Sequence, residues 1–167
     1  MAKQSKLTVA NLRKEDKKLF GGTRKVVIDG FTLEIDSIFR DTKIEQMVYE
    51  LINAGDKFRK NGAKLETILS PYAILLTMKY FTSLDIPNDL DGQMEVMNLL
   101  LDLKLFDKIV NEMPEDEMYK IGQRIVDLGQ SALDTLDEFE REAAKLDIEN
   151  EEVARLLLNK GDKNADI

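Results

Sequence analysis

The stretch VVIDGFTLEI, residues 26–35, consists of two short apolar alternations joined by Asp29-Gly30. Asp-Gly is typical of a type I′ hairpin turn, because both central residues of that turn need a positive φ. A two-residue loop pairs Ile28 with Phe31, and alternate apolar side chains then share one face of the hairpin. The residues predicted on this face are Val26, Ile28, Phe31, Leu33 and Ile35.

An isolated two-stranded hairpin is only marginally stable in water, so this hairpin needs a surface to pack on. One interpretation is that its apolar face covers one end of a helical core. The other is that its open edges pair with strands of a partner protein. We expect the hairpin to be a contact element, but the two interpretations stay open at this point.

The first long helix is predicted over residues 43–60. Thr42 and Glu45 are three positions apart, which is typical of a capping box, and Asn61-Gly62 supplies a stop. Apolar residues follow at helical spacing and form one stripe. The stripe consists of Ile44, Met47, Val48, Leu51, Ile52 and Phe58.

Two strongly apolar helices come next. The segment LETIL, residues 65–69, predicts one or two separate turns, and Ser70-Pro71 is typical of a helix start. The helix over residues 71–84 is apolar on nearly every side, which favours the centre of the core. A further apolar helix is predicted over residues 94–110. These two helices need each other and the helix at 43–60 to cover their apolar surface.

The most regular pattern lies nearer the C-terminus, where a helix is predicted from about Pro114 to Lys145. Its apolar residues recur every three or four positions, close to a heptad seam with a stutter near Ala132. The seam fits an antiparallel pairing within one chain, and it fits self-association equally well. The seam residues are Met118, Ile121, Ile125, Leu128, Ala132, Leu136, Phe139, Ala143 and Leu146.

The predicted fold class is mainly α: a helical bundle with one small N-terminal β-hairpin and a long C-terminal helix. Residues 1–22 form a basic N-terminal arm with a short helix that Asn11 caps, and the hairpin occupies residues 23–36. The helical domain covers residues 37–160 and ends in a short helix capped by Asn150. Residues 161–167 form a mobile tail.

Composition excludes several kinds of chemistry. The 167-residue chain has no Cys and no His, which excludes disulfides and removes the commonest metal ligand and general base. Its net charge of −8 is segregated, because residues 1–25 hold eight basic and two acidic residues. The acidic remainder repels nucleic-acid phosphates, which argues against a DNA-binding protein. The basic arm is free to touch an acidic partner.

No group of residues has the spacing of a catalytic or ligand-binding motif. DLDG, residues 89–92, lacks the ligands of a calcium loop at the required positions, and GGTRK, residues 21–25, lacks the spacing of a P-loop. The prediction is a protein with no catalytic, cofactor-binding or metal-binding residue. The chain shows no apolar run of membrane-spanning length and no signal-peptide core, so we expect a cytoplasmic protein.

The order of parts resembles a known family. A basic arm precedes VVIDGFTLEIDSIFRDTKIEQMV, then YAILLTMKYFTSLDIP, then MNLLLDLKLFDKIV before a Met-Pro break. This layout, over about residues 5–140, is similar to the tail assembly chaperones of siphophages and prophages of Gram-positive hosts. The resemblance implies a non-enzymatic protein of the host cytoplasm. It implies that the protein keeps the tape measure protein soluble and delivers it with tail tube subunits.

The predicted contact surface combines the apolar face of the hairpin with a groove between the helices at 71–84 and 94–110. An amphipathic client helix would lie in such a groove. Two alternatives are a small structural protein of the phage tail or connector and a helical inhibitor or adaptor of a host protein. A homo-oligomer stays an option, and no nucleic acid, membrane or cofactor is expected. The predicted protein-binding residues are Val26, Ile28, Phe31, Leu33, Ile35, Leu76, Tyr80, Met94, Met97 and Leu101.

Overall fold

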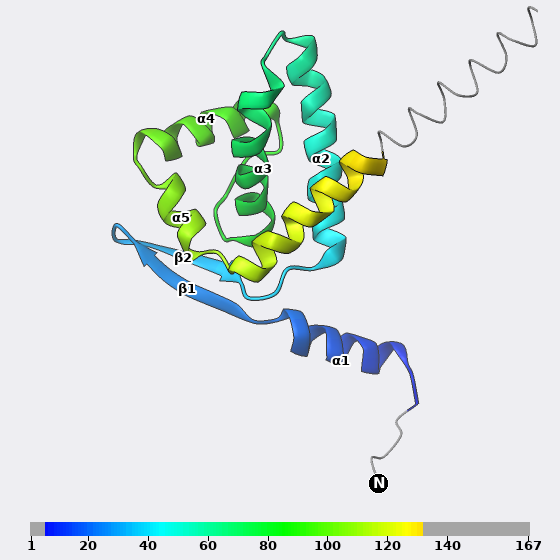
Figure 1. Cartoon of the computed structure of the whole chain (residues 1–167). Helices are drawn as coiled ribbons and strands as arrows, with labels where there is room; N and C mark the ends of the chain where they lie inside the picture. Colours follow the sequence, from blue (N-terminus) through cyan, green and yellow to red (C-terminus); the bar gives the residue numbers. More distant parts are fainter. Residues whose placement is uncertain (1–5, 132–167) are drawn as a thin grey trace, which may run out of the picture. The chain divides into compact units, whose positions relative to one another are not determined.

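The computed structural model describes residues 6–131 and is mainly helical, with one small β-hairpin (Figure 1). Its elements follow the order α1, β1, β2, α2, α3, α4 and α5, and a further helix covers residues 115–131. The chain divides into two compact units, Met1–Gly122 and Gln123–Ile167. The predicted fold class is confirmed. The predictions for residues 132–167, including the later part of the seam, lie outside the described residues.

The hairpin consists of β1 (Thr23–Ile28) and β2 (Phe31–Asp36), which pair antiparallel. The two turn residues have positive φ, 50° at Asp29 and 86° at Gly30. Both signs are those of the predicted type I′ turn. The turn is therefore built by a dipeptide that tolerates the left-handed region at both positions.

The predicted register is confirmed, with Ile28 opposite Phe31 and Val26 opposite Leu33. Four of the five face residues are buried, and Ile35 is fully inaccessible. Phe31 differs, because 69% of its surface is exposed at the end of the hairpin. The apolar face thus covers the helical core, as in the first interpretation. The Phe31 ring, at the end of this face, stays exposed to solvent.

One edge of the hairpin is partly used by the chain itself. The segment after α3 forms an isolated bridge between Thr82 and Ile35. The Ser83 backbone N–H donates to the Glu34 carbonyl at 2.8 Å, and the Ser83 hydroxyl accepts from the Glu34 N–H at 2.9 Å. This part of the β2 edge is therefore already paired within the chain.

Helix α1 (Val9–Phe20) begins at a different cap from the predicted one. Thr8 is the N-cap, and its hydroxyl accepts a hydrogen bond from the Asn11 backbone N–H at 3.2 Å. The prediction that Asn11 caps this helix is wrong, because Thr8 supplies the same kind of acceptor one turn earlier. No residue of α1 is buried.

Helix α2 (Asp41–Lys60) has Arg40 at its N-cap position, without a side-chain cap hydrogen bond. The predicted capping box at Thr42 is therefore wrong. Ile52, which belongs to the predicted apolar stripe, is 52% exposed. The small residues Ala54 and Gly55 are buried instead, because they continue the face of Leu51 at three and four positions on.

Helix α3 (Leu65–Phe81) is one continuous helix with Pro71 inside it. The predicted break before Pro71 is wrong, and so is the predicted end at residue 84. Pro71 removes one backbone donor, but burial of the following turns holds the helix together. The predicted central position is confirmed by its buried residues, which are Tyr72, Leu75, Leu76, Thr77, Met78 and Phe81.

The predicted single helix over residues 94–110 is wrong, because the chain forms α4 (Leu90–Asp102) and α5 (Phe106–Glu112). The break lies at Lys104, whose φ is +57°. The Leu105 N–H then donates to the Leu100 carbonyl at 2.9 Å, which satisfies a carbonyl of the last turn of α4. The chain therefore turns at Lys104 and sends α5 toward the hairpin (Figure 1).

Helices α2 and α3 lie side by side, and α4 and α5 continue the helical layer toward the hairpin tip (Figure 1). The core is tightest where the Phe39 and Phe81 rings stack with their centroids 4.0 Å apart. Both rings are fully inaccessible. Phe39 thus fixes the link between the hairpin and α2 onto the end of α3.

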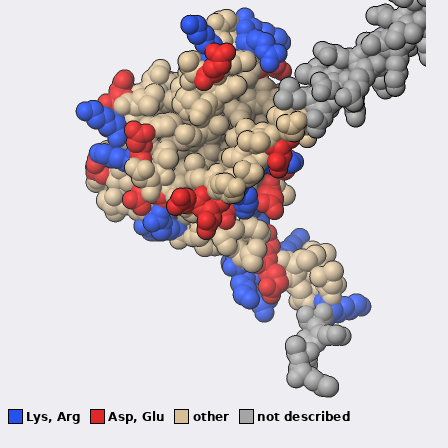
Figure 2. All heavy atoms as spheres, viewed as in Figure 1, with Lys and Arg blue, Asp and Glu red and all other residues tan. Residues whose placement is uncertain are grey.

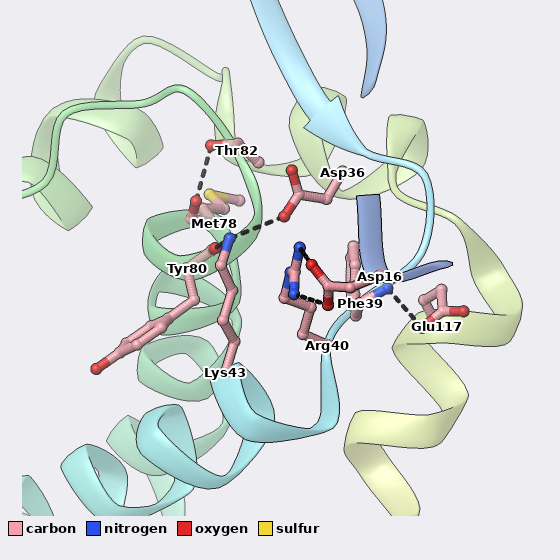
Figure 3. A network of polar contacts seen from close by, with 9 residues as sticks. All are labelled: Asp16, Asp36, Phe39, Arg40, Lys43, Met78, Tyr80, Thr82 and Glu117. Atoms are coloured by element: carbon pink, nitrogen blue, oxygen red, sulfur yellow. Dashed lines mark hydrogen bonds and ion pairs between the residues drawn. The ribbon is translucent and has the colours of Figure 1, made fainter. Parts of the chain in front are cut away.

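Polar contacts hold the same corner (Figure 3). Lys43 Nζ donates to Asp36 Oδ2 at 2.9 Å and to the Tyr80 carbonyl at 3.0 Å. The Phe39 N–H donates to Glu117 Oε2 at 3.0 Å. The start of α2 is therefore tied to the hairpin, to α3 and to the helix that begins at residue 115.

Candidate protein-binding site

An apolar groove lies at the tip of the hairpin. It is a cavity of about 390 Å³ between the hairpin tip, the segment after α3 and the turn that joins α4 to α5. We call it the tip groove. Its main apolar lining residues are Ile28, Phe31, Leu84, Leu100, Leu103 and Ile109.

The groove walls come from distant parts of the sequence that ion pairs hold together. Lys108 on α5 forms an ion pair with Asp29 in the hairpin turn. Farther along the hairpin, the Arg24 guanidinium lies 3.4 Å from the Glu112 carboxylate and also donates to the Glu112 carbonyl. These contacts join α5 to β1 and to the hairpin turn.

The mouth of the groove exposes large apolar side chains. Phe31 is 69% exposed and Leu103 is 62% exposed. Full burial of a side chain of this size stabilises a complex by about 1.5–3 kcal/mol. The groove therefore suits a partner that brings apolar side chains. Within residues 6–131, no three or more acidic residues come together as a metal site.

A second cavity, of about 470 Å³, lies among α2, α3 and the start of α4. At its wall the Glu50 carboxylate accepts hydrogen bonds from Lys79 Nζ, Tyr80 Oη and Gln93 Nε2, each at 2.7 Å. Gln93 is only 1% exposed, and its amide oxygen accepts from the Tyr72 hydroxyl. We call these five residues the Glu50 cluster.

Burial and hydrogen bonds shift the pKa values of Glu50 and of the two tyrosines of the Glu50 cluster away from neutral pH. Burial alone raises the pKa of Glu50, but the hydrogen bonds from Lys79, Tyr80 and Gln93 together hold it below its usual range. Burial, followed by the hydrogen bond to Glu50, raises the pKa of Tyr80 to about 12. Burial likewise raises the pKa of Tyr72. The cluster therefore connects three helices as a structural link.

The structure separates the ten predicted protein-binding residues into several places. Ile28, Phe31 and Leu33 line the tip groove. Tyr80 belongs to the Glu50 cluster, and Leu101 is 48% exposed on α4 outside both cavities. Met94 is half-buried on the same helix. Those buried in the core are Val26, Ile35, Leu76 and Met97.

Sequence reasoning missed the second wall of the groove. Leu84, Leu103 and Leu105 line it, and none of them was predicted. A signal was present in LDLKL, residues 101–105, where leucines alternate with charged residues and helical spacing is interrupted. The polar residues of the Glu50 cluster carried no comparable signal, since they lie 43 positions apart at Glu50 and Gln93.

Residues 9–159 match the YomO family, which is most of the chain. The chain belongs to the YomO family. A relative is the SPbeta prophage-derived protein YomO of Bacillus subtilis (strain 168), 26% identical over 117 residues. The match covers 68% of this chain and 69% of the relative. No solved structure matches the chain.

The family match joins the chain to a prophage-derived protein, in agreement with the phage origin that the resemblance implied. The matched range includes the hairpin and all helices from α2 to α5, and therefore both walls of the tip groove. Between residues 6 and 131, no helix has the length and apolar character to cross a membrane.

Proposed function

We propose that this YomO-family protein is a non-enzymatic binding protein of phage assembly, which holds an amphipathic helix of a client protein in the tip groove. The observation that carries the proposal is the groove itself, with Phe31 and Leu103 exposed at its mouth. The client that fits the family resemblance is the tape measure protein, and the role is that of a tail assembly chaperone in the host cytoplasm.

The physical reasoning concerns the solubility of a long helix. A tape measure protein with an apolar seam aggregates when that seam stays in water. A helix laid into an apolar groove buries its side chains at positions i, i+3, i+4 and i+7. The net charge of −8 on the chaperone then keeps the complex dispersed.

The first experiment is a pull-down of the tagged protein from cells that express its native gene neighbourhood, followed by mass spectrometry. Recovery of a very long helical protein is expected, together with absence of the tagged protein from finished particles. Retention in purified particles would instead support a structural tail or connector protein. Recovery of a host protein alone would support an inhibitor or adaptor.

A matched pair of variants tests whether the groove makes the contact. Leu103→Asp places a charge at the groove mouth, and Ile52→Asp places one on α2, where Ile52 is 52% exposed outside the groove. We expect Leu103→Asp to reduce client recovery at least tenfold and Ile52→Asp to leave it unchanged. Equal recovery with both variants would remove the groove from the proposal.

A further inference from the structure

Helix α1 buries no face against the part of the chain that the structure describes. It has twelve residues, and none of them is buried. A helix shorter than about 12–15 residues is marginal in water and depends on packing of an apolar face. Its apolar side chains are nevertheless open to solvent, with Val9 64%, Leu12 53% and Leu19 55% exposed.

These three side chains form one face. At 100° per residue, Val9, Leu12 and Leu19 fall within an arc of about 80°. Lysines occupy the opposite side, and Figure 2 shows Lys and Arg side chains around this part of the chain. The helix therefore has the amphipathic pattern of a segment that docks on an apolar groove.

The chain's own contacts keep α1 away from its own tip groove. Arg40 Nη2 donates to Asp16 Oδ2 at 3.0 Å, and the Arg40 guanidinium lies 4.8 Å from the Phe20 ring centroid. These contacts hold the C-terminal end of α1 at the base of the hairpin. The groove lies at the other end of β1, six residues or about 20 Å farther on. The free face of α1 is thus available to another molecule.

Charge makes the groove of a second copy a suitable place for α1. Residues 6–20 hold five basic and two acidic residues. Among the residues that line the groove, Asp85 is the one that carries a charge, and most of the others are apolar. A basic helix with an apolar face therefore complements the groove in polarity, and Asp85 offers an acceptor to one of its basic side chains.

We propose that α1 of one copy docks in the tip groove of a second copy. The contact joins two different surfaces, so it builds a ring, a reciprocal pair or an open chain of copies. The inference rests on the same groove as the proposed function, because α1 and the client helix compete for it. In the absence of a client, the α1 helix of each copy then covers the groove of another copy. A client helix with higher affinity displaces α1 from the groove.

The test uses two variants that each remove one side of the contact. Leu12→Asp removes the helix side and Leu103→Asp removes the groove side. Ala10→Asp and Ile52→Asp are the controls, because each makes the same change of charge at an exposed position outside the contact. Light scattering after size exclusion gives the mass of the full-length chain, and circular dichroism checks that each variant is folded.

We expect the wild type and both controls to share one larger mass, and both test variants to share a mass at least twofold smaller. An equal mixture of Leu12→Asp and Leu103→Asp chains contains one intact helix and one intact groove. The mixture is therefore expected to give a species of twice the mass of either variant alone. This complementation distinguishes a helix-to-groove contact from any other association of the chain.

An unchanged mass for Leu12→Asp, or a mixture that shows no new species, would overturn the inference. Vesicles of anionic phosphatidylglycerol provide the competing outcome: if Leu12→Asp abolishes vesicle binding without a change of mass, α1 binds lipid. The client pull-down separates this failure from that of the proposed function. A groove that still needs Leu103 for client recovery keeps the proposed function even when α1 does not dock there.

Discussion

The tip groove and the Glu50 cluster border cavities of similar size, about 390 and 470 Å³, but they differ in what their walls leave unpaired. The polar groups of the Glu50 cluster hydrogen-bond one another across α2, α3 and α4. The groove leaves Phe31 and Leu103 in water. The volume of a cavity is therefore a poor guide to partner binding. Large apolar side chains left exposed at its mouth are a better one.

The largest expected effect on stability comes from a substitution in the Glu50 cluster. Glu50→Ala removes the acceptor of Lys79, Tyr80 and Gln93, and we expect the free energy of unfolding to fall by about 2–3 kcal/mol. Urea titration measures the change. Glu95→Ala, on the exposed side of α4, is the control and should change stability by less than about 0.5 kcal/mol. A similar small loss for Glu50→Ala would mean that the cluster links nothing.

The turn that positions Phe31 gives the next effect. Gly30 has a φ of +86°, and Gly30→Val should lower the free energy of unfolding by about 1–2 kcal/mol, because a β-branched residue is strained there. Gly22→Ala is the control, since an added Cβ would meet only Ser37 atoms at 3.6 and 3.8 Å. Thermal melting compares the two. Equal melting temperatures would show that the turn geometry is not needed.

We expect the Glu50 cluster to make the stability of the protein depend on pH. The pKa of Tyr80 is raised from 10.0 to about 12, so its contribution to stability is complete below pH 10 and is lost as the pH rises to 12. The pKa of Glu50 is lowered from 4.5, so its contribution is present above that pH and is lost as the pH falls. Urea midpoints across both ranges measure these losses.

Tyr80→Phe supplies the control for the alkaline range. The variant lacks the hydroxyl that ionises, so its stability should fall less between pH 10 and 12 than that of the wild type. Identical alkaline profiles for the two proteins would assign the loss to other groups.

The smallest expected effect on stability is at the groove mouth. Phe31→Ser changes a side chain that is 69% exposed, so the free energy of unfolding should move by less than about 0.5 kcal/mol. Client recovery should still fall at least tenfold, because an exposed aromatic side chain is a favoured anchor in interfaces. Denaturant titration measures the change in stability, and the pull-down measures client recovery. A large loss of stability would place Phe31 in the core and remove the contrast between the two regions.

The hairpin could be predicted down to its register because its signals are local. Asp29-Gly30 fixes the turn, and alternation fixes the face, so only Phe31 departed from the expected burial. The helix boundaries were harder. Pro71 stays inside α3 because the surrounding turns are buried, and Lys104 breaks a helix without any glycine or proline to announce it.

Only the wall of the candidate site that the hairpin forms could be predicted from the sequence. Ile28, Phe31 and Leu33 follow from the hairpin pattern, whereas Leu103 and Leu105 enter through a turn that brings α5 back to β1. Tertiary contacts between segments more than 70 positions apart leave no spacing to recognise in a single sequence. The range that matches the family includes both walls of the groove, so the match does not indicate which residues form the site.

The ion pairs from Asp29 to Lys108 and from Arg24 to Glu112 join segments that the ribosome synthesises at different times. The hairpin is complete once Asp36 has been added, but its partner helix follows roughly 75 residues later. At about 5–20 residues per second the ribosome needs on the order of 4–15 s for that interval. The segment after α3 already pairs with β2 by then, but the tip of the hairpin lacks its α5 wall for that time, so we expect a chain cut short before α5 to lack a complete tip groove.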